Sequence, residues 1–413
     1  MKKEVLKYLA GRLIPALVSL ALIVLVIRYL GPVEYGRYSL LLYTALLVIT
    51  LDFHWVQVSI RRFLGGMPRE TNVVMSRFFD LTTLNALFST LLIVLIGLFY
   101  FHLGLVELAL VALFTFLTHF YLFHQAILEA YHCSVRTAIL EGTDQILVLI
   151  ALLAGLFFFE LRNFSVIFGS LVFGLAGVLL LRVVIRVRGL LTIDLKHLYW
   201  DSRFSGKVIG FGYGIALWLF FSHLLMAADR FIIMEYFGYH DAGMYSGLKD
   251  LLFKLVTFAS FPIYISYQSK ISDQWNAHHQ PEAWKTIKEA ISFEILIFII
   301  VFIIFMVFKP MLFDNLLKIP ELNFWLIYLP VLMASFLWQV ALLFQRFLEL
   351  VFKSSRILIA MGVCVALNIV LNLIFVPRNG MVASSIILLL TSLLYAGFMV
   401  LVALISSKKL QAG

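Results

Sequence analysis

Long apolar stretches separated by short polar connections recur along the whole sequence. They lie at about residues 8–29, 37–60, 78–101, 105–127, 138–159, 163–185, 206–234, 243–268, 287–308, 322–345, 355–376 and 380–405. An α-helix needs ~20 predominantly apolar residues to cross the hydrocarbon core of a bilayer, and these stretches are of that order. The pattern therefore predicts an all-α polytopic membrane protein with twelve transmembrane helices. The alternating ten-residue segments that are typical of a membrane β-barrel are absent.

Composition supports this class, since 62% of the residues are hydrophobic and only 13% are charged. A soluble core does not need so much apolar surface. The basic start of the chain is similar to a signal peptide, but its apolar run is too long and leads into further spans, so we expect it to be retained as the first helix. Cys133 and Cys364 lie far apart in sequence and give neither a disulfide framework nor the spacing of metal ligands.

Lysine and arginine gather at every second connection, for example at Arg61 and Arg62 after the second stretch and at Lys285 and Lys288 before the ninth. Basic residues accumulate on the cytoplasmic side of membrane proteins. Both termini are therefore predicted to be cytoplasmic. Most of the net charge of +9 follows from this topology, so the charge gives no reason to expect a nucleic-acid partner.

The connection between the sixth and seventh stretches separates two halves of six spans each. Its sequence is basic and amphipathic, which predicts a segment that lies on the inner membrane surface in contact with the lipids. The expected division is an N-terminal six-helix bundle at 1–185, a cytoplasmic linker at 186–205 and a C-terminal six-helix bundle at 206–413.

One short pattern occurs twice, as LGPVEYGRYS from Leu30 to Ser39 and as FGYHDAGMYS from Phe237 to Ser246. The first joins spans one and two, and the second joins spans seven and eight, both on the predicted outer side. Parallel repeats of this kind are one common way to build a transporter. Glycines permit tight turns between helices, so we expect a gating role for four of them: Gly31, Gly36, Gly238 and Gly243.

The segments RYLGPVEYGRYSLLL and ADRFIIMEYFGYHDAGMYS resemble the polysaccharide-exporter branch of the MOP superfamily, and within it the Wzx-type O-antigen flippases. The resemblance implies a V-shaped pair of helical bundles around a central cavity lined by spans one, two, seven and eight. It also implies that the substrate is an undecaprenyl-diphosphate-linked oligosaccharide for O-antigen or lipopolysaccharide biosynthesis, with other polysaccharide-assembly membrane proteins as partners. One departure is that Tyr239 stands where the first turn has Pro32.

Polar residues in the second stretch fall on one helical face, which holds Tyr43, Thr50, His54, Gln57 and Arg61. Such a stripe either lines a cavity or forms a polar seam between packed helices. Asp52 lies on nearly the opposite face, and we expect it to pair with a neighbouring helix.

The seventh and eighth stretches hold further candidates. Gly206, Gly210 and Gly214 form a small-xxx-small pattern that predicts close packing of a neighbouring backbone. Asp250 and Lys254, spaced i and i+4, can neutralise each other, whereas Lys249 has no such partner on its own helix. Asn368 and Asn372 in the eleventh stretch share one face and predict hydrogen bonds between helices.

Basic side chains in the spans predict a site for a diphosphate, because guanidinium and ammonium groups bind phosphate oxygens with charge-assisted hydrogen bonds. The proposed substrate contacts are Arg12, His54, Gln57, Arg61, Arg230, Lys249 and Lys254. The alternatives are snorkelling of Arg12 to the membrane surface and structural ion pairs of Arg230 and Lys249 with Asp229 or Asp250. Asp52, Asp229 and Asp250 are the candidates for coupling or gating.

Two other functions compete with a flippase. A multidrug antiporter of the same fold, coupled to H+ or Na+, would favour an acidic or aromatic cavity. A polysaccharide polymerase or glycosyltransferase would need acid or base residues in a large outer loop, but the longest outer connection, 309–322, carries only Asp314 and Glu321 and no histidine. The sequence therefore favours a transporter that is not an enzyme and uses no cofactor or metal.

Overall fold

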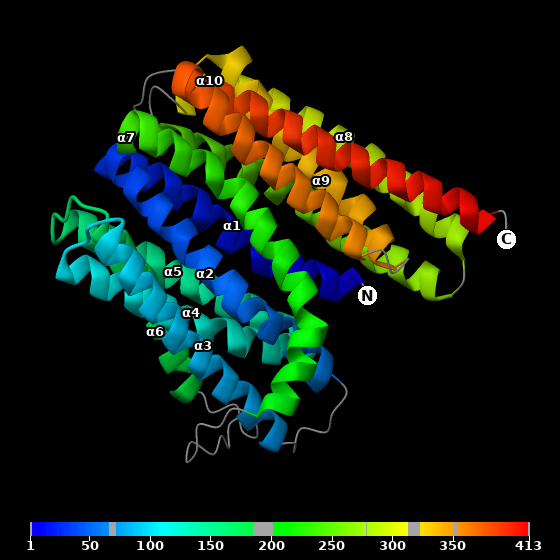
Figure 1. The fold of residues 1–413 in the computed structure, drawn as a ribbon, viewed down its shortest axis with the longest axis horizontal. Helices are drawn as coiled ribbons and strands as arrows, with labels where there is room; N and C mark the ends of the chain where they lie inside the picture. The colour runs from blue at the N-terminus through cyan, green and yellow to red at the C-terminus, as the bar shows by residue number, and fades with distance from the viewer. Residues whose placement is uncertain are drawn as a thin grey trace. The chain divides into compact units, whose positions relative to one another are not determined.

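The computed structural model describes residues 2–65, 72–131, 133–184, 201–277, 279–312, 323–350 and 354–411, and these residues are almost entirely helical (Figure 1). The helices, with one short π-helical turn, η2, are α1 (Lys2–Leu30), α2 (Pro32–Leu64), α3 (Asn72–Phe99), α4 (Leu105–Ala130), α5 (Ser134–Phe157), α6 (Ser165–Val184), α7 (Ser202–Asn276), α8 (Gln280–Pro310), η2 (Phe324–Tyr328), α9 (Leu329–Leu350) and α10 (Ser354–Gln411). The predicted all-α class is confirmed.

Two of the helices are each divided by a glycine. Gly238 in α7 has φ 80° and Gly380 in α10 has φ 55°, a left-handed conformation that glycine adopts without steric cost. Nine helices in the described part of the chain are long and apolar enough to cross a membrane, and α1 adds a shorter apolar segment, Pro15–Leu30. Divided at the two glycines and counted with α1, these helices give the twelve segments that the sequence predicts.

The contacts divide the chain into two compact units. The N-terminal unit comprises Met1–Ser19 and Arg37–His223, and the C-terminal unit comprises Leu20–Gly36 and Leu224–Gly413. These units do not follow the sequence halves, because α1 and the first half of α7 each contribute to both. The linker expected at 186–205 lies outside the described residues up to position 200. Its last residues begin α7.

In the N-terminal unit, α3 packs on α4, and both α4 and α5 pack on α6. Its core is an apolar cluster centred on the C-terminal half of α2, with Phe53, Val56 and Ile60 fully buried. In the C-terminal unit, α9 packs along α10, and the rings of Trp338 and Tyr395 stack with centroids 5.7 Å apart. Apolar contact and a few hydrogen bonds are what hold helices together in lipid.

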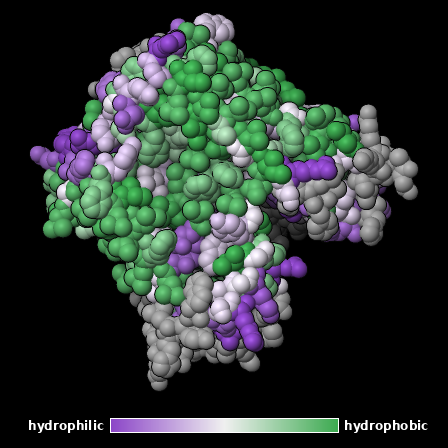
Figure 2. Space-filling model, in the orientation of Figure 1, coloured by the Kyte–Doolittle hydropathy of each residue, from purple (hydrophilic) through white to green (hydrophobic). Residues whose placement is uncertain are grey.

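Large apolar side chains also remain exposed on the helices, as at Leu91, Leu105 and Ile303. Figure 2 shows that apolar residues cover most of the visible face. Such exposure is unfavourable in water but is expected where a helix faces hydrocarbon.

The prediction that a neighbouring backbone packs closely on Gly206, Gly210 and Gly214 is wrong. No described atom lies within 4 Å of a Cβ placed on any of these three glycines. The close approach occurs at Gly212 instead, where a Cβ would lie 2.8 Å from the Cα of Trp55 in α2. Gly212 lies two residues from Gly210, about 200° around the helix, so the helix presents nearly the opposite face to α2.

Candidate functional site

A compact group of charged and phenolic side chains lies in the C-terminal unit, and we call it the ion cluster. Its residues are Tyr35, Asp229, Arg230, Tyr245, Lys249, Asp250 and Lys254. Gly238 explains why they meet, because its left-handed backbone divides α7 into two helices. Asp229 precedes this glycine by nine residues and Lys249 follows it by eleven, which is about 14 and 17 Å of helix. The two side chains therefore reach similar depths.

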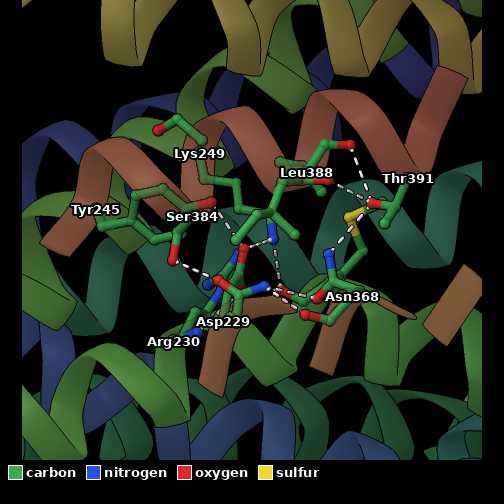
Figure 3. A network of polar contacts seen from close by, with 12 residues as sticks. Asp229, Arg230, Tyr245, Lys249, Asn368, Ser384, Leu388 and Thr391 are labelled. Carbon is green, nitrogen blue, oxygen red and sulfur yellow. Dashed lines mark hydrogen bonds and ion pairs between the residues drawn. The ribbon is translucent and has the colours of Figure 1, made fainter. Parts of the chain in front are cut away.

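Lys249 and Asp229 form a fully buried ion pair. The Lys249 Nζ donates to Asp229 Oδ2 at 2.6 Å and to the backbone oxygen of Met226 at 3.0 Å. The Tyr245 hydroxyl donates to the same Asp229 oxygen at 2.7 Å, and Figure 3 shows these contacts converging on Asp229. The ammonium is thus held by a carboxylate and a carbonyl, and a buried charge needs such partners.

Arg230 and Asp250 form a second ion pair beside the first. The guanidinium binds both carboxylate oxygens, with Nη1–Oδ2 2.9 Å and Nη2–Oδ1 2.6 Å. The Tyr35 hydroxyl at the start of α2 donates to Asp250 Oδ2 at 2.8 Å. Arg230 is 1% exposed, whereas the Asp250 side chain is 15% exposed. Asp250 therefore lies on the accessible side of the pair.

These contacts show which partner each charge takes. Lys249, which has no oppositely charged partner at i+4 on its own helix, forms an ion pair with Asp229. Asp250 was expected to pair with Lys254, but it gives both carboxylate oxygens to Arg230, while Lys254 interacts electrostatically with Asp250. The alternative of structural ion pairs for Arg230 and Lys249 is what the structure shows. Among the residues that define the cluster, three are basic and two are acidic.

Tyr35 and Tyr245 were not identified from the sequence as members of this cluster. Both lie within the repeated segments, so the repeat itself was the signal that could have found them. Each hydroxyl adds a hydrogen bond to a carboxylate that already accepts from a cation. Together the two tyrosines leave each carboxylate with more than one donor, as buried acidic groups require.

The predicted hydrogen bonds of Asn368 and Asn372 are confirmed. Across the two halves of α10, Asn368 Nδ2 donates to Thr391 Oγ1 at 3.2 Å, and Ser384 Oγ donates to Asn372 Oδ1 at 2.7 Å. Figure 3 draws Asn368, Thr391 and Ser384 in one network with Asp229, Arg230, Tyr245 and Lys249 of the ion cluster.

The four turn glycines differ in what they require. Gly31 and Gly238 have φ 85° and 80°, so each needs the freedom of glycine. Gly36 and Gly243 are constrained by space instead. A Cβ on Gly36 would overlap the carbonyl oxygen of Tyr239, and a Cβ on Gly243 would overlap that of Pro32. The two repeated turns thus pack directly on each other.

In the N-terminal unit, the polar stripe of α2 meets α7. The hydroxyl of Thr50 lies 2.9 Å from His223 Nδ1, and the rings of His54 and His223 are 6.4 Å apart. Gln57 is buried. Arg61 forms an ion pair with Glu129 of α4 at 2.7 Å. The stripe is therefore a seam between packed helices at Thr50, and it becomes accessible towards Arg61. The side chain of Arg12 lies outside the described part of the structure.

Asp52 pairs with a neighbouring helix, as predicted. Its Oδ2 accepts a hydrogen bond from Ser89 Oγ of α3 at 2.7 Å. The same oxygen lies 3.8 Å from His119 Nε2 of α4. His119 was not identified from the sequence, because nothing in the sequence places α4 beside this face of α2.

The sequence matches no family model, and it has no significant match among the curated proteins. Solved structures, in contrast, match the whole chain. A multidrug resistance MATE family transporter of the MOP superfamily in an inward-facing conformation has a TM-score of 0.70, covering 96% of this chain and 99% of that one at 12% identity. The fold is that of the MOP-superfamily transporters.

Two other neighbours show the range of this fold. An outward-facing conformation of a MATE family transporter matches with a TM-score of 0.68 at 12% identity, covering 98% of this chain and 95% of that one. A MOP superfamily transporter from Pyrococcus furiosus, whose binding pocket has a reverse polarity that suggests a different function, matches with a TM-score of 0.62 at 12% identity over the same shares. Solved structures of this fold thus include an inward-facing and an outward-facing conformation. At these identities the fold leaves the cargo open.

Proposed function

We propose that this protein is a flippase that moves an undecaprenyl-diphosphate-linked oligosaccharide from the cytoplasmic to the outer leaflet of a bacterial inner membrane. One observation supports this most directly. The ion cluster holds three basic side chains against two carboxylates, and each carboxylate already binds a cation. A site of this kind attracts an anion rather than a cationic drug.

The diphosphate would bind by exchange with the internal carboxylates. In the absence of cargo, Asp229 and Asp250 serve as counter-ions that make the buried cations tolerable in the membrane. A phosphate oxygen that approaches from the accessible side of Asp250 could accept from the Arg230 fork, and Lys254 would add its charge. His54, Gln57 and Arg61 in the N-terminal unit, together with Arg12, remain proposed contacts for the same substrate.

The membrane potential can drive this transport. With the inside negative by ~100 mV, moving two negative charges outward is favoured by the potential and releases roughly 4–5 kcal/mol, at about 2.3 kcal/mol for each charge. In this proposal both termini are cytoplasmic. Enzymes that assemble the polysaccharide would supply the lipid-linked substrate on the cytoplasmic face and consume it on the outer face.

The test is a flipping assay in proteoliposomes. A fluorescent short-chain polyprenyl-diphosphate oligosaccharide is placed in both leaflets, a potential is imposed with potassium and valinomycin, and an impermeant quencher reports the outer fraction. We expect redistribution by the parent protein and partial activity in Arg230→Lys, which keeps the charge but loses the fork. Lys270→Gln, which removes an exposed cation outside the ion cluster, serves as the control. Failure of the parent protein to redistribute the lipid would overturn the proposal.

A second candidate is a multidrug antiporter coupled to H+ or Na+. It is favoured by the likeness to multidrug resistance MATE transporters and by the Asp52 carboxylate in the N-terminal unit. The same proteoliposomes distinguish the two functions, with ethidium as an organic cation and a gradient of pH or Na+ as the driving force. Ethidium transport without movement of the glycolipid would establish the antiporter instead.

A further inference from the structure

We propose that Asp52 and His119 form a proton-binding site in the N-terminal unit, built by α2, α3 and α4. This site is separate from the ion cluster, which lies in the C-terminal unit. It requires no assumption about the cargo, so it would serve a flippase or a drug exporter equally.

The hydrogen bonds of His119 determine which ring nitrogen carries its proton. His119 Nδ1 lies 2.8 Å from the backbone oxygen of Thr115. A carbonyl oxygen only accepts, so Nδ1 must donate and the neutral ring carries its hydrogen there. Nε2 is then a bare acceptor. This nitrogen is buried and has no hydrogen-bond partner, which is unusual for a polar atom within a membrane span.

The bare nitrogen faces a second acceptor. Asp52 Oδ2 lies 3.8 Å from His119 Nε2, too far for a hydrogen bond but close for two groups that both carry lone pairs. One added proton resolves this arrangement. When it binds Nε2, the imidazolium donates to the carboxylate, and no covalent bond between heavy atoms forms or breaks. Release to solvent reverses the step.

The surroundings leave Asp52 able to accept such a bond. Ser89 is the hydroxyl donor to Oδ2, and Asn85 Nδ2 donates to the backbone oxygen of Asp52 at 2.8 Å. The ring of Phe53 packs 5.1 Å from that of His119. His54 is linked electrostatically with His119, His223 and Arg61. The Asp52 side chain is 17% exposed, so the pair is not completely enclosed by the packed helices.

The pair favours a proton over a metal ion. Sodium and other hard cations prefer oxygen ligands, whereas one of the two facing atoms here is an imidazole nitrogen. Transition metals accept imidazole, but they take more ligands than two. Among the described residues, no group of three or more His, Cys, Asp or Glu side chains is placed to hold a metal.

Protonation would also move helices. A charge-assisted hydrogen bond from nitrogen to oxygen spans about 2.8 Å, about 1 Å less than the separation of Nε2 and Oδ2 in this structure. Formation of the bond would therefore draw α4 towards α2. That displacement links occupancy of the site to the packing of the N-terminal unit, as a coupling site requires.

The test is ¹⁵N nuclear magnetic resonance of the full-length protein in detergent micelles, labelled on histidine and titrated between about pH 8 and 5. The His119→Gln variant identifies the His119 signals. We expect Nε2 to change from a bare to a protonated nitrogen, with a hydrogen bond to a carboxylate at low pH. In Asp52→Asn we expect this change to be lost, because the counter-charge is gone.

His124 provides the matched control on the same helix. Its Nδ1 also faces the carbonyl oxygen four residues earlier, at 2.7 Å, but its electrostatic neighbour is the cation Arg182. His124→Gln should leave the His119 titration unchanged. A His119 Nε2 that stays bare throughout in the unmodified protein would overturn the proposal, as would a change that persists in Asp52→Asn. A response to Na+ at constant pH would also overturn it. None of these readouts depends on transport, so the flippase proposal stands or fails separately.

Discussion

Single charged residues in this protein are stabilised by a specific partner, and the partner determines what a substitution does. Lys249 and Asp229 are both almost completely buried. In the pair of Arg61 in α2 with Glu129 in α4, the side chains are 43% and 27% exposed. Removal of one member of a buried pair leaves the other charge without compensation, which costs far more than the pair contributes. An exposed pair is screened by solvent and contributes little.

The first prediction therefore compares the two pairs. Asp229→Asn should lower the free energy of unfolding by about 3–5 kcal/mol. Lys249→Met should also destabilise the protein, and the double variant should recover much of the combined loss. The exposed pair, treated in the same way with Arg61→Met and Glu129→Gln, should show a coupling of no more than about 1 kcal/mol. Denaturant unfolding in detergent micelles measures the free energy of unfolding of the single and double variants of each pair, which gives the coupling energy. Additive losses at the buried pair would contradict the prediction.

The second prediction concerns glycines that look alike in sequence. Gly36→Ala and Gly243→Ala should each destabilise the protein by about 1–3 kcal/mol, because a methyl group has no space beside the opposite carbonyl. Gly210→Ala on exposed helix should be neutral or stabilising by up to ~1 kcal/mol, since alanine favours helix. Melting temperatures of the purified variants decide this. Equal melting temperatures for Gly36→Ala and the parent would rule out the close packing.

At this scale the sequence predicts which residues share a face of one helix, but not which helix that face meets. Asp229 and Lys249 are twenty residues apart, and only the reversal at Gly238 brings them together. The spacing of Asp250 and Lys254 was therefore a poor guide, since a neighbouring helix supplied a better partner. His119 was missed for the same reason.

At the scale of elements, the start of α7 shows how a helix terminus is fixed. Asp201 precedes the helix, and its Oδ1 accepts from the backbone N–H of Arg203 and Phe204 at 3.0 and 3.1 Å. Its other oxygen pairs with Arg77 of α3 at 3.0 Å. One carboxylate thus satisfies two of the free N–H groups of the first turn and connects α7 to α3.

The third prediction follows from this carboxylate. The hydrogen bond from Phe204, with the Arg77 charge, lowers the pKa of Asp201. A lowered pKa in the folded state stabilises the protein above the unfolded value of about 4, and this contribution is lost as the pH falls through the folded value. Asp201→Asn should therefore lower the melting temperature at pH 7, and the difference should disappear in acid. Asp241→Asn, at an exposed position, is the control and should change little at either pH. A difference that is constant down to pH 3 would exclude the charge effect.

The elements were also the most predictable level. The apolar stretches located every helical segment, because lipid requires a long run of apolar residues for each crossing. Two predicted segments are joined directly at Gly238 in α7, and two at Gly380 in α10. This was not predicted, because the sequence does not show that a single left-handed residue replaces the expected loop.

For the whole molecule, the distribution of basic residues predicts which ends of the helices face outward. The fourth prediction tests this by cysteine labelling in intact cells, in a Cys133→Ser background. Val33→Cys and His240→Cys, at the repeated turns, should react with an impermeant maleimide. Arg62→Cys and Lys270→Cys, at the opposite ends of their helices, should react only after permeabilisation. Labelling of position 62 or 270 in intact cells would show that the predicted orientation in the membrane is wrong.

The division of the whole molecule was harder to predict than its helix count. The repeat indicated two halves of equal length, whereas the contacts assign parts of α1 and of α7 to both units. A repeat in the sequence does not fix the packing, which follows whichever surfaces are complementary. The close contact between the two repeated turns is one reason for the difference, since it places Gly36 in the unit of Gly243.

That contact has the form of an interface between identical subunits. Gly36 faces the carbonyl oxygen of residue 239 and Gly243 faces that of residue 32, so each copy of the turn gives and receives the same interaction, as in a two-fold symmetric dimer. Because the contact uses backbone oxygens, it does not depend on the side chain at that position, which is Pro32 in one turn and Tyr239 in the other. The glycines, which supply the space, are the same in both turns.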